Sequence, residues 1–314
     1  MPNRWLVFLL LSCVALAANA TDSPRALVAG VAIAIEDHYF DAARGHEIAE
    51  GLREKAQSGA FDASTGPDAL AAALTAYLKP LDHHFRVKRG RPGDPMRRAA
   101  VDPWQSPPGT NWLSRADVVP GNVGVLALRE FADFEFGRDD QPARKALDAA
   151  LQRLSGTDAL VVDLRGNRGG SPAMVGYLAS AFTARDANIF NVFHSREGTQ
   201  SEAPREWYAT PRPRVPLYVV IDASTGSAAE SFAYTLQQSR RATIVGEPSG
   251  GAANPGGPVA TREGLVVFVP TGSPVNPFTH GNWEGVGVQP DARATSSEAL
   301  DVALELARNA AGQQ

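Results

Sequence analysis

The stretch from Leu217 to Gln238 reads LYVVIDASTGSAAESFAYTLQQ, and it decides the fold of this chain. It opens with an apolar run, Leu217 to Ile221, which has the length and composition of a buried strand. A turn of small residues follows, and from Ser227 onward apolar residues recur at helical spacing. The stretch therefore predicts a strand, a sharp turn and a helix that begins near Ser227.

Ser227 has two interpretations at the start of this helix. Serine is a common N-cap, and Glu230 three residues later completes a capping box. Alternatively Ser227 is a nucleophile, because a strand–turn–helix junction presents its hydroxyl beside the free N–H groups of the first helical turn. The local pattern alone favours the cap, whereas the rest of the chain favours the nucleophile.

Apolar runs and helical segments alternate on both sides of this stretch. Buried strands are expected at Val123–Leu128, Ala159–Leu164, Thr243–Val245 and Leu265–Val269, and helices at Leu147–Leu154, Ala173–Phe182 and Ser297–Ala310. Such an alternation predicts a mainly parallel α/β sheet, with a site formed by loops at the carboxyl ends of the strands.

The N-terminal part has a different pattern. Three short helical segments lie between Thr21 and Leu78, which predicts a small helical bundle or cap. The segment from Pro80 to Val87, PLDHHFRV, is expected to run from a turn into a strand.

A region rich in Arg, Pro and Gly, Lys88–Thr110, follows and is typical of a surface linker. We therefore expect a helical domain over residues 21–105, which carries the histidine segment, and an α/β domain over residues 106–314.

The first 20 residues have the pattern of an export signal. Arg4 precedes an apolar run from Trp5 to Ala18, and Ala18-Asn19-Ala20 offers a cleavage site of small residues. The run is too short for a membrane span, so cleavage after Ala20 and a periplasmic or secreted product are expected. Cys13 lies inside this segment in a poor lipoprotein box, so the mature chain is expected to lack disulfides and thiolate sites.

Composition restricts the class of partner. The chain is 44% hydrophobic and 20% charged, as ordinary globular proteins are, and its net charge of -4 gives no reason to expect nucleic acid or an anionic membrane. The six histidines include an adjacent pair, His83 and His84, but show no metal-binding motif. We expect neither a metal nor a cofactor.

A glycine-rich loop, RGNRGG at Arg165–Gly170, directly follows a predicted buried strand. It lacks the spacing of a dinucleotide fingerprint and the ending of a P-loop. One interpretation is a structural turn. The other is an oxyanion hole, in which an N–H from Gly169 or Gly170 joins the N–H of Ala228.

Four separated motifs resemble those of the tail-specific, or C-terminal processing, serine peptidases. The first is the segment Leu81–Val87, which is similar to a D-G-H-F segment, and the second is the loop Asp163–Gly170, which is similar to D-x-R-x-N-x-G-G. The third motif is the nucleophile helix with the strand after it, at Ser227–Glu230 and Arg241–Pro248, and the fourth is a closing motif at Asn282–Asp291. The first motif resembles one branch, which includes the tricorn protease core and the repeats of interphotoreceptor retinoid-binding protein. The resemblance runs from about Leu27 to Ala310.

The resemblance implies particular site residues. The tail-specific branch pairs its serine with a downstream lysine, but no lysine follows Lys145 here. The other branch has a histidine base supported by a glutamate, and His84 and Glu284 match these positions. His83 stands where tricorn has a serine, so His83 either replaces or supports His84. Phe85, directly after His84, favours His84 as the base.

The implied fold is an N-terminal helical cap on an α/β domain with a curled β-β-α sheet, of the crotonase-like kind, without a PDZ domain. The implied function is a secreted or periplasmic serine endopeptidase, with Ser227 as nucleophile and a peptide or protein as substrate. A non-catalytic module that binds an apolar ligand or peptide, as in the retinoid-binding relatives, is the alternative. Glu284, next to Trp283 and just before Gly285 and Gly287 in a turn, could also be a solvated surface residue.

Overall fold

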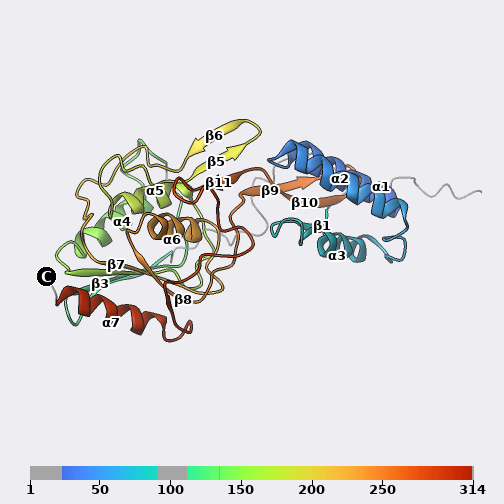
Figure 1. The fold of residues 1–314 in the computed structure, drawn as a ribbon. Helices are drawn as coiled ribbons and strands as arrows, with labels where there is room; N and C mark the ends of the chain where they lie inside the picture. Colours follow the sequence, from blue (N-terminus) through green and yellow to red (C-terminus); the bar gives the residue numbers. More distant parts are fainter. Residues whose placement is uncertain (1–22, 91–111, 134, 313–314) are drawn as a thin grey trace, which may run out of the picture.

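The computed structural model describes residues 23–90, 112–133 and 135–312, which form two lobes (Figure 1). The helical lobe comprises residues 23–90 together with residues 256–270, and the sheet lobe comprises the other described residues. The predicted signal segment with Cys13, and the predicted domain boundary near residue 105, lie outside the described residues.

The helical lobe begins with three helices, α1 (Pro24–His38), α2 (Ala42–Gln57) and α3 (Pro67–Leu78). Ser23 and Asp41 cap the first two, because their side chains accept backbone N–H groups of the first helical turn. Helix α1 packs against α2, while α3 packs mainly against a strand. The expected bundle of helices alone is therefore not confirmed.

A three-stranded sheet completes this lobe, in the order β1 (Arg86–Arg89), β10 (Leu265–Pro270) and β9 (Gly256–Ala260). The β9–β10 hairpin comes from the C-terminal half of the chain. Leu265, Val267 and Val269 point from β10 into one apolar core with the helices. The lobe thus combines residues that lie about 180 positions apart, as Val87 and Val267 are when they pair.

The sheet lobe is built on a six-stranded sheet in the order β12 (Ala292–Arg293), β8 (Thr243–Gly246), β7 (Leu217–Ile221), β4 (Ala159–Asp163), β3 (Val123–Leu128) and β2 (Leu113–Val119). Neighbouring strands from β12 to β3 are parallel, and β2 alone pairs antiparallel. The predicted mainly parallel α/β arrangement is confirmed. Strand β2 was not predicted.

Helices cover both faces of this sheet (Figure 1). Helix α7 (Ala299–Ala311) packs on one face, and α4 (Pro142–Arg153), α5 (Pro172–Ser180) and α6 (Ala228–Gln238) pack on the other. Successive residues of β4 alternate between the faces: Leu160 and Val162 join the core under α4 to α6, and Val161 joins the core under α7. Burial on both faces explains the uninterrupted apolar runs in the sequence.

A second small sheet, β11 (Ser273–Val275), β5 (Val192–Ser195) and β6 (Gly198–Ser201), was not predicted. Its short and mostly exposed strands carry little hydrophobic periodicity. Among the described helices, none combines the length and hydropathy that crossing a bilayer requires.

Candidate active site

Ser227 occupies a strained turn between β7 and α6. It is the N-cap of α6, as predicted, with backbone angles of φ 53° and ψ -121°. Residues other than glycine rarely adopt a positive φ, and such conformations persist only where the surroundings enforce them. The side chain is exposed, so a ligand can reach the hydroxyl.

The side chain of Glu230 fixes this turn by hydrogen bonds from inside the protein. Its carboxylate is fully buried and accepts the N–H of Ser227 at 2.8 Å, the hydroxyl of Ser249 at 2.6 Å, and the N–H groups of Gly251 at 2.6 Å and Ala252 at 2.9 Å. Burial raises the pKa of Glu230 above its usual range, although these hydrogen bonds act in the opposite direction. Glu230 thus not only completes the capping box but also connects the turn at Ser227 to residues 249–252 by hydrogen bonds.

The glycine-rich loop after β4 lies directly against the serine turn. A Cβ built on Gly169 would lie 2.8 Å from the Cβ of Ser227 and 3.0 Å from the N of Ala228. The N–H of Gly169 donates to Asn167 Oδ1 at 2.9 Å. Within the described chain, the N–H groups of Ala228 and Gly170 donate to no other atom. The N–H of the residue after Ser227 and the N–H of the residue after Gly169 are therefore both available to a ligand.

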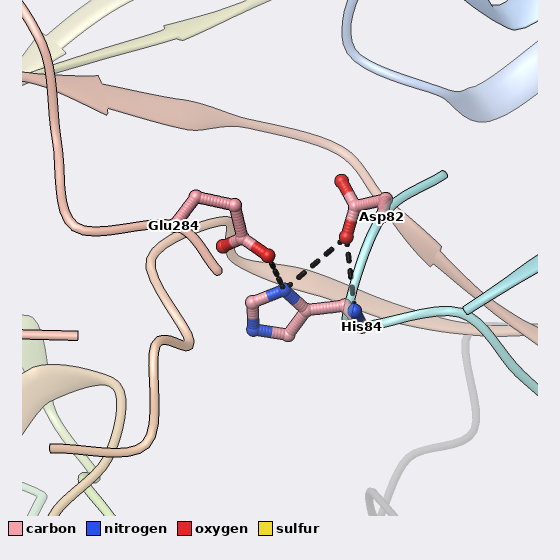
Figure 2. A group of neighbouring side chains, drawn as sticks. All are labelled: Asp82, His84 and Glu284. Atoms are coloured by element: carbon pink, nitrogen blue, oxygen red, sulfur yellow. Dashed lines mark hydrogen bonds and ion pairs between the residues drawn. The ribbon is translucent and has the colours of Figure 1, made fainter. Parts of the chain in front are cut away.

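The two histidines lie in the turn before β1, and their rings have different surroundings. His83 is exposed and lies beside Gly285, since a Cβ built there would be 3.4 Å from His83 Nε2. The side chain of His84 is only 14% exposed. Its Nδ1 lies 3.3 Å from Glu284 Oε1 and 3.4 Å from Asp82 Oδ1 (Figure 2). The structure thus places His84, and not His83, between two carboxylates.

This environment changes the charge of His84. Burial lowers the pKa of the imidazole, but the ion-pair contacts of Nδ1 with Asp82 and Glu284 outweigh it and raise the pKa to about 9. Burial likewise opposes ionisation of Asp82, yet its bonds to His84 hold the pKa of that carboxyl below its usual range. At neutral pH the imidazole is protonated between anionic partners.

Glu284 is a positioned carboxylate. Its Oε2 accepts the N–H of Ala253 at 2.8 Å and the N–H of Asn254 at 3.0 Å, and its own N–H donates to Asn282 Oδ1 at 2.9 Å. These bonds leave Oε1 directed at His84, with the side chain only 19% exposed. The alternative of a solvated turn residue does not describe this geometry.

One segment, residues 249–254, connects the two groups of residues. We call it the linking loop. Its first four residues carry three of the four donors to Glu230, and Ala253 and Asn254 bind Glu284. Ser227 and His84 donate their backbone N–H groups to Glu230 and Asp82, and among the described residues no hydrogen bond joins their side chains. Catalytic hydrogen bonds often form only when substrate binds.

Asp82, His84 and Glu284 also offer donor atoms within 4.8 Å of one another, a spacing that would suit a metal ion. In this structure the two carboxylates face the imidazole and balance its charge. The expectation that no metal is needed stays a prediction.

Sequence reasoning missed three residues of this arrangement. Asp82 had a signal, since it is the acidic residue of the D-x-H-F segment, but no role was assigned to it. Glu230 was predicted only as a helix cap. Asn254 lies in a loop of glycine, alanine and proline without periodicity, so nothing in the sequence marked it.

The sequence is similar to one family of known proteins. The model described as Peptidase family S41 matches residues 122–294. Carboxyl-terminal-processing peptidase 1, chloroplastic, of Arabidopsis thaliana is 31% identical over 186 residues, which cover 58% of this chain and 35% of the relative. The carboxyl-terminal-processing protease of Synechocystis sp. is 34% identical over 139 residues, 43% of this chain and 30% of the relative. The chain thus spans about one third of the length of these relatives.

Two solved structures cover nearly the whole chain. A putative peptidase from Parabacteroides merdae is similar with a TM-score of 0.64 at 15% identity, covering 91% of this chain and 96% of that one. The photosystem II D1 C-terminal processing protease is similar with a TM-score of 0.55 at 18% identity, covering 91% and 97%. At these identities the likeness shows the fold.

Proposed function

The chain belongs to peptidase family S41, and from this premise we propose that it is a serine endopeptidase with Ser227 as nucleophile. His84 is the general base, and Glu284 supports it. The substrate is a peptide or protein, and neither a metal nor a cofactor takes part.

The proposed reaction assigns one step to each of these groups. Ser227 Oγ attacks the carbonyl carbon of the scissile bond, and its proton passes to Nε2 of His84. The oxyanion that forms accepts hydrogen bonds from the N–H groups of Ala228 and Gly170, because the N–H of Gly169 is already bound to Asn167. His84 returns the proton to the leaving amine, and water then hydrolyses the acyl-enzyme by the same proton transfers.

The observation that carries this proposal is the backbone of Ser227. Two other caps in this chain, Ser23 and Asp41, have ordinary extended angles of φ -70°, ψ 140° and φ -96°, ψ 109°. Ser227 differs from both, with φ 53° and ψ -121°. A helix cap needs no such strain, whereas strained residues gather at functional sites.

The absence of lysine after Lys145 supports a histidine base, and so a tricorn-like branch without a PDZ domain. The mainly parallel sheet with helices on both faces supports a crotonase-like assignment for the sheet lobe. The alternative of a non-catalytic binding module is not favoured, because a binder has no need to keep a strained serine and a buried, charge-paired histidine. We also propose export, with cleavage after Ala20.

A fluorophosphonate probe tests the assignment. The probe should label Ser227, and Ser227→Ala should abolish both labelling and peptide hydrolysis while the melting temperature changes little, because the side chain is exposed. Ser224→Ala, at an exposed serine in the same turn, is the matched control and should keep activity. Labelling of Ser224 or Ser171 in place of Ser227 would overturn the assignment.

A further inference from the structure

The Nδ1 atom of His84 faces a second carboxylate, that of Asp82, to which the proposed reaction gives no role. Asp82 lies in the helical lobe, whereas Glu284 lies in the sheet lobe. The two oxygens are nearly equidistant from Nδ1, at 3.4 Å for Asp82 Oδ1 and 3.3 Å for Glu284 Oε1. A single acidic partner is enough for a serine–histidine–acid triad, so the second one needs an explanation.

Asp82 is held rigidly in this position. It is 5% exposed, and its Oδ2 accepts the hydroxyl of Tyr39 at 3.1 Å and Nδ2 of Asn254 at 3.0 Å. Its Oδ1 accepts the backbone N–H of His84 at 2.9 Å. This last bond alone would be an ordinary turn in which an aspartate accepts the N–H two residues later. Such a turn does not require the ring of His84 to fold back to within 3.4 Å of the same oxygen.

Asn254 contacts both carboxylates. Its backbone N–H donates to Glu284 Oε2, and its side-chain Nδ2 donates to Asp82 Oδ2, each at 3.0 Å. Asn254 is itself 5% exposed. One buried residue of the linking loop therefore sets the separation of two carboxylates that come from different lobes.

We propose that Asp82 is a positioning residue that shares the Nδ1 proton of His84 with Glu284, and that Asn254 aligns the two carboxylates. A neutral imidazole carries one proton, and two anions at Nδ1 keep that proton there. Nε2 then has a free lone pair for the proton of Ser227, and both carboxylates lie beside the imidazolium that forms. The kinetic part of this proposal rests on the proposed function.

A shared role has a kinetic signature. At a pH above 9, where His84 is neutral in every protein compared, Asp82→Asn and Glu284→Gln should each lower kcat by about 10-fold to 10²-fold, because one carboxylate remains at Nδ1. The double variant should lose about 10⁴-fold, the loss known for a triad without its acidic member. Little change in KM is expected, since neither carboxylate is proposed to touch substrate.

The decisive measurement is the titration of His84 by NMR in the Ser227→Ala protein, with EDTA present to remove any bound cation. The midpoint should lie near 9 in the parent protein. It should fall by about one pH unit or more in Asp82→Asn and in Glu284→Gln, and further in the double variant. Asp37→Asn, the same charge change at an exposed site, should leave the midpoint of His84 unmoved.

Asn254→Ala keeps both carboxylates and replaces Asp82→Asn in this test if Asp82→Asn fails to fold. Asn254→Ala should also lower the midpoint of the His84 titration, by a smaller amount than Asp82→Asn. An unmoved midpoint in folded Asp82→Asn, or in Asn254→Ala where Asp82→Asn is unfolded, would overturn the proposal and leave Asp82 as a turn residue. Because the titration needs no substrate, a shifted midpoint without any peptidase activity would instead overturn only the proposed function.

Discussion

At the scale of single residues, the surroundings of His84 decide when it can act as a base. Only the neutral imidazole accepts a proton, and an unperturbed histidine is mostly neutral above about pH 6.5. In this chain Asp82 and Glu284 favour the charged form and raise the pKa of His84 to about 9. The two carboxylates that stabilise the imidazolium in the transition state thus also raise the pH at which the neutral imidazole becomes available as a base.

The dependence of activity on pH follows from this pKa. Because the raised pKa keeps His84 protonated below about pH 9, kcat/KM should rise about tenfold per pH unit through the neutral range and level off near pH 9. A pH–rate profile measured from pH 6 to 10 checks this. A plateau reached already near pH 6.5 would show that the two carboxylates do not act on His84 in the free enzyme.

At the scale of elements, two adjacent glycines in the loop after β4 have different tasks. Both have positive φ, 115° at Gly169 and 132° at Gly170. A Cβ on Gly169 would meet the serine turn, whereas a Cβ on Gly170 would lie 2.1 Å from the carbonyl oxygen of Phe131. The loop therefore lies between Phe131 of the sheet-lobe core, which Gly170 contacts, and Ser227, which Gly169 contacts.

Alanine at each glycine should separate these tasks. Gly169→Ala should push Ser227 and Ala228 out of place and lower kcat by about 10² to 10³, the range for a lost oxyanion donor. The positive φ strains alanine at either position, but Gly170→Ala should lose more stability, about 1–3 kcal/mol or more, because its Cβ would also lie 2.1 Å from the carbonyl oxygen of Phe131. Thermal melts and kcat measured on both proteins check this, and normal kcat in Gly169→Ala would contradict the contact with the serine turn.

At the scale of the whole molecule, the site depends on how the two lobes meet. His84 and Asp82 belong to the helical lobe, and Ser227 and Glu284 belong to the sheet lobe. Besides the bond from Asn254 to Asp82, Arg196 between β5 and β6 crosses to the end of α1. Its guanidinium donates to the carbonyl oxygens of Tyr39 at 2.6 Å and Glu36 at 2.5 Å.

Arg196→Ala should loosen this junction without opening either core. We expect kcat/KM to fall by about 10-fold to 10²-fold, because a displacement of about 1 Å between nucleophile and base is costly. Amide exchange should accelerate near residues 36–45 and 192–201. Arg196→Lys should restore little, because an ammonium lacks the fork that reaches both carbonyls. Unchanged kcat/KM together with unchanged exchange would show that Arg196 does not hold the lobes.

Some parts of this protein could be predicted from the sequence because they depend on local patterns. The strand β3 has the predicted bounds, Val123–Leu128, and α6 begins directly after the predicted cap, Ser227. A buried parallel strand must be apolar along its length, and a helix start needs particular residue types, so both leave a trace within about ten residues. The glycine-rich loop was visible for the same reason.

Other parts were decided only by tertiary structure. Nothing in the order of residues showed that β9 and β10 would complete the helical lobe, or that Asn254 would bind two carboxylates. His83 and His84 differ by one position, and the burial of Phe85 and Val87 in the helical lobe sets which of them turns toward Glu284. Periodicity records which face of an element is buried, whereas the partner of a polar side chain depends on which distant segments pack against that element.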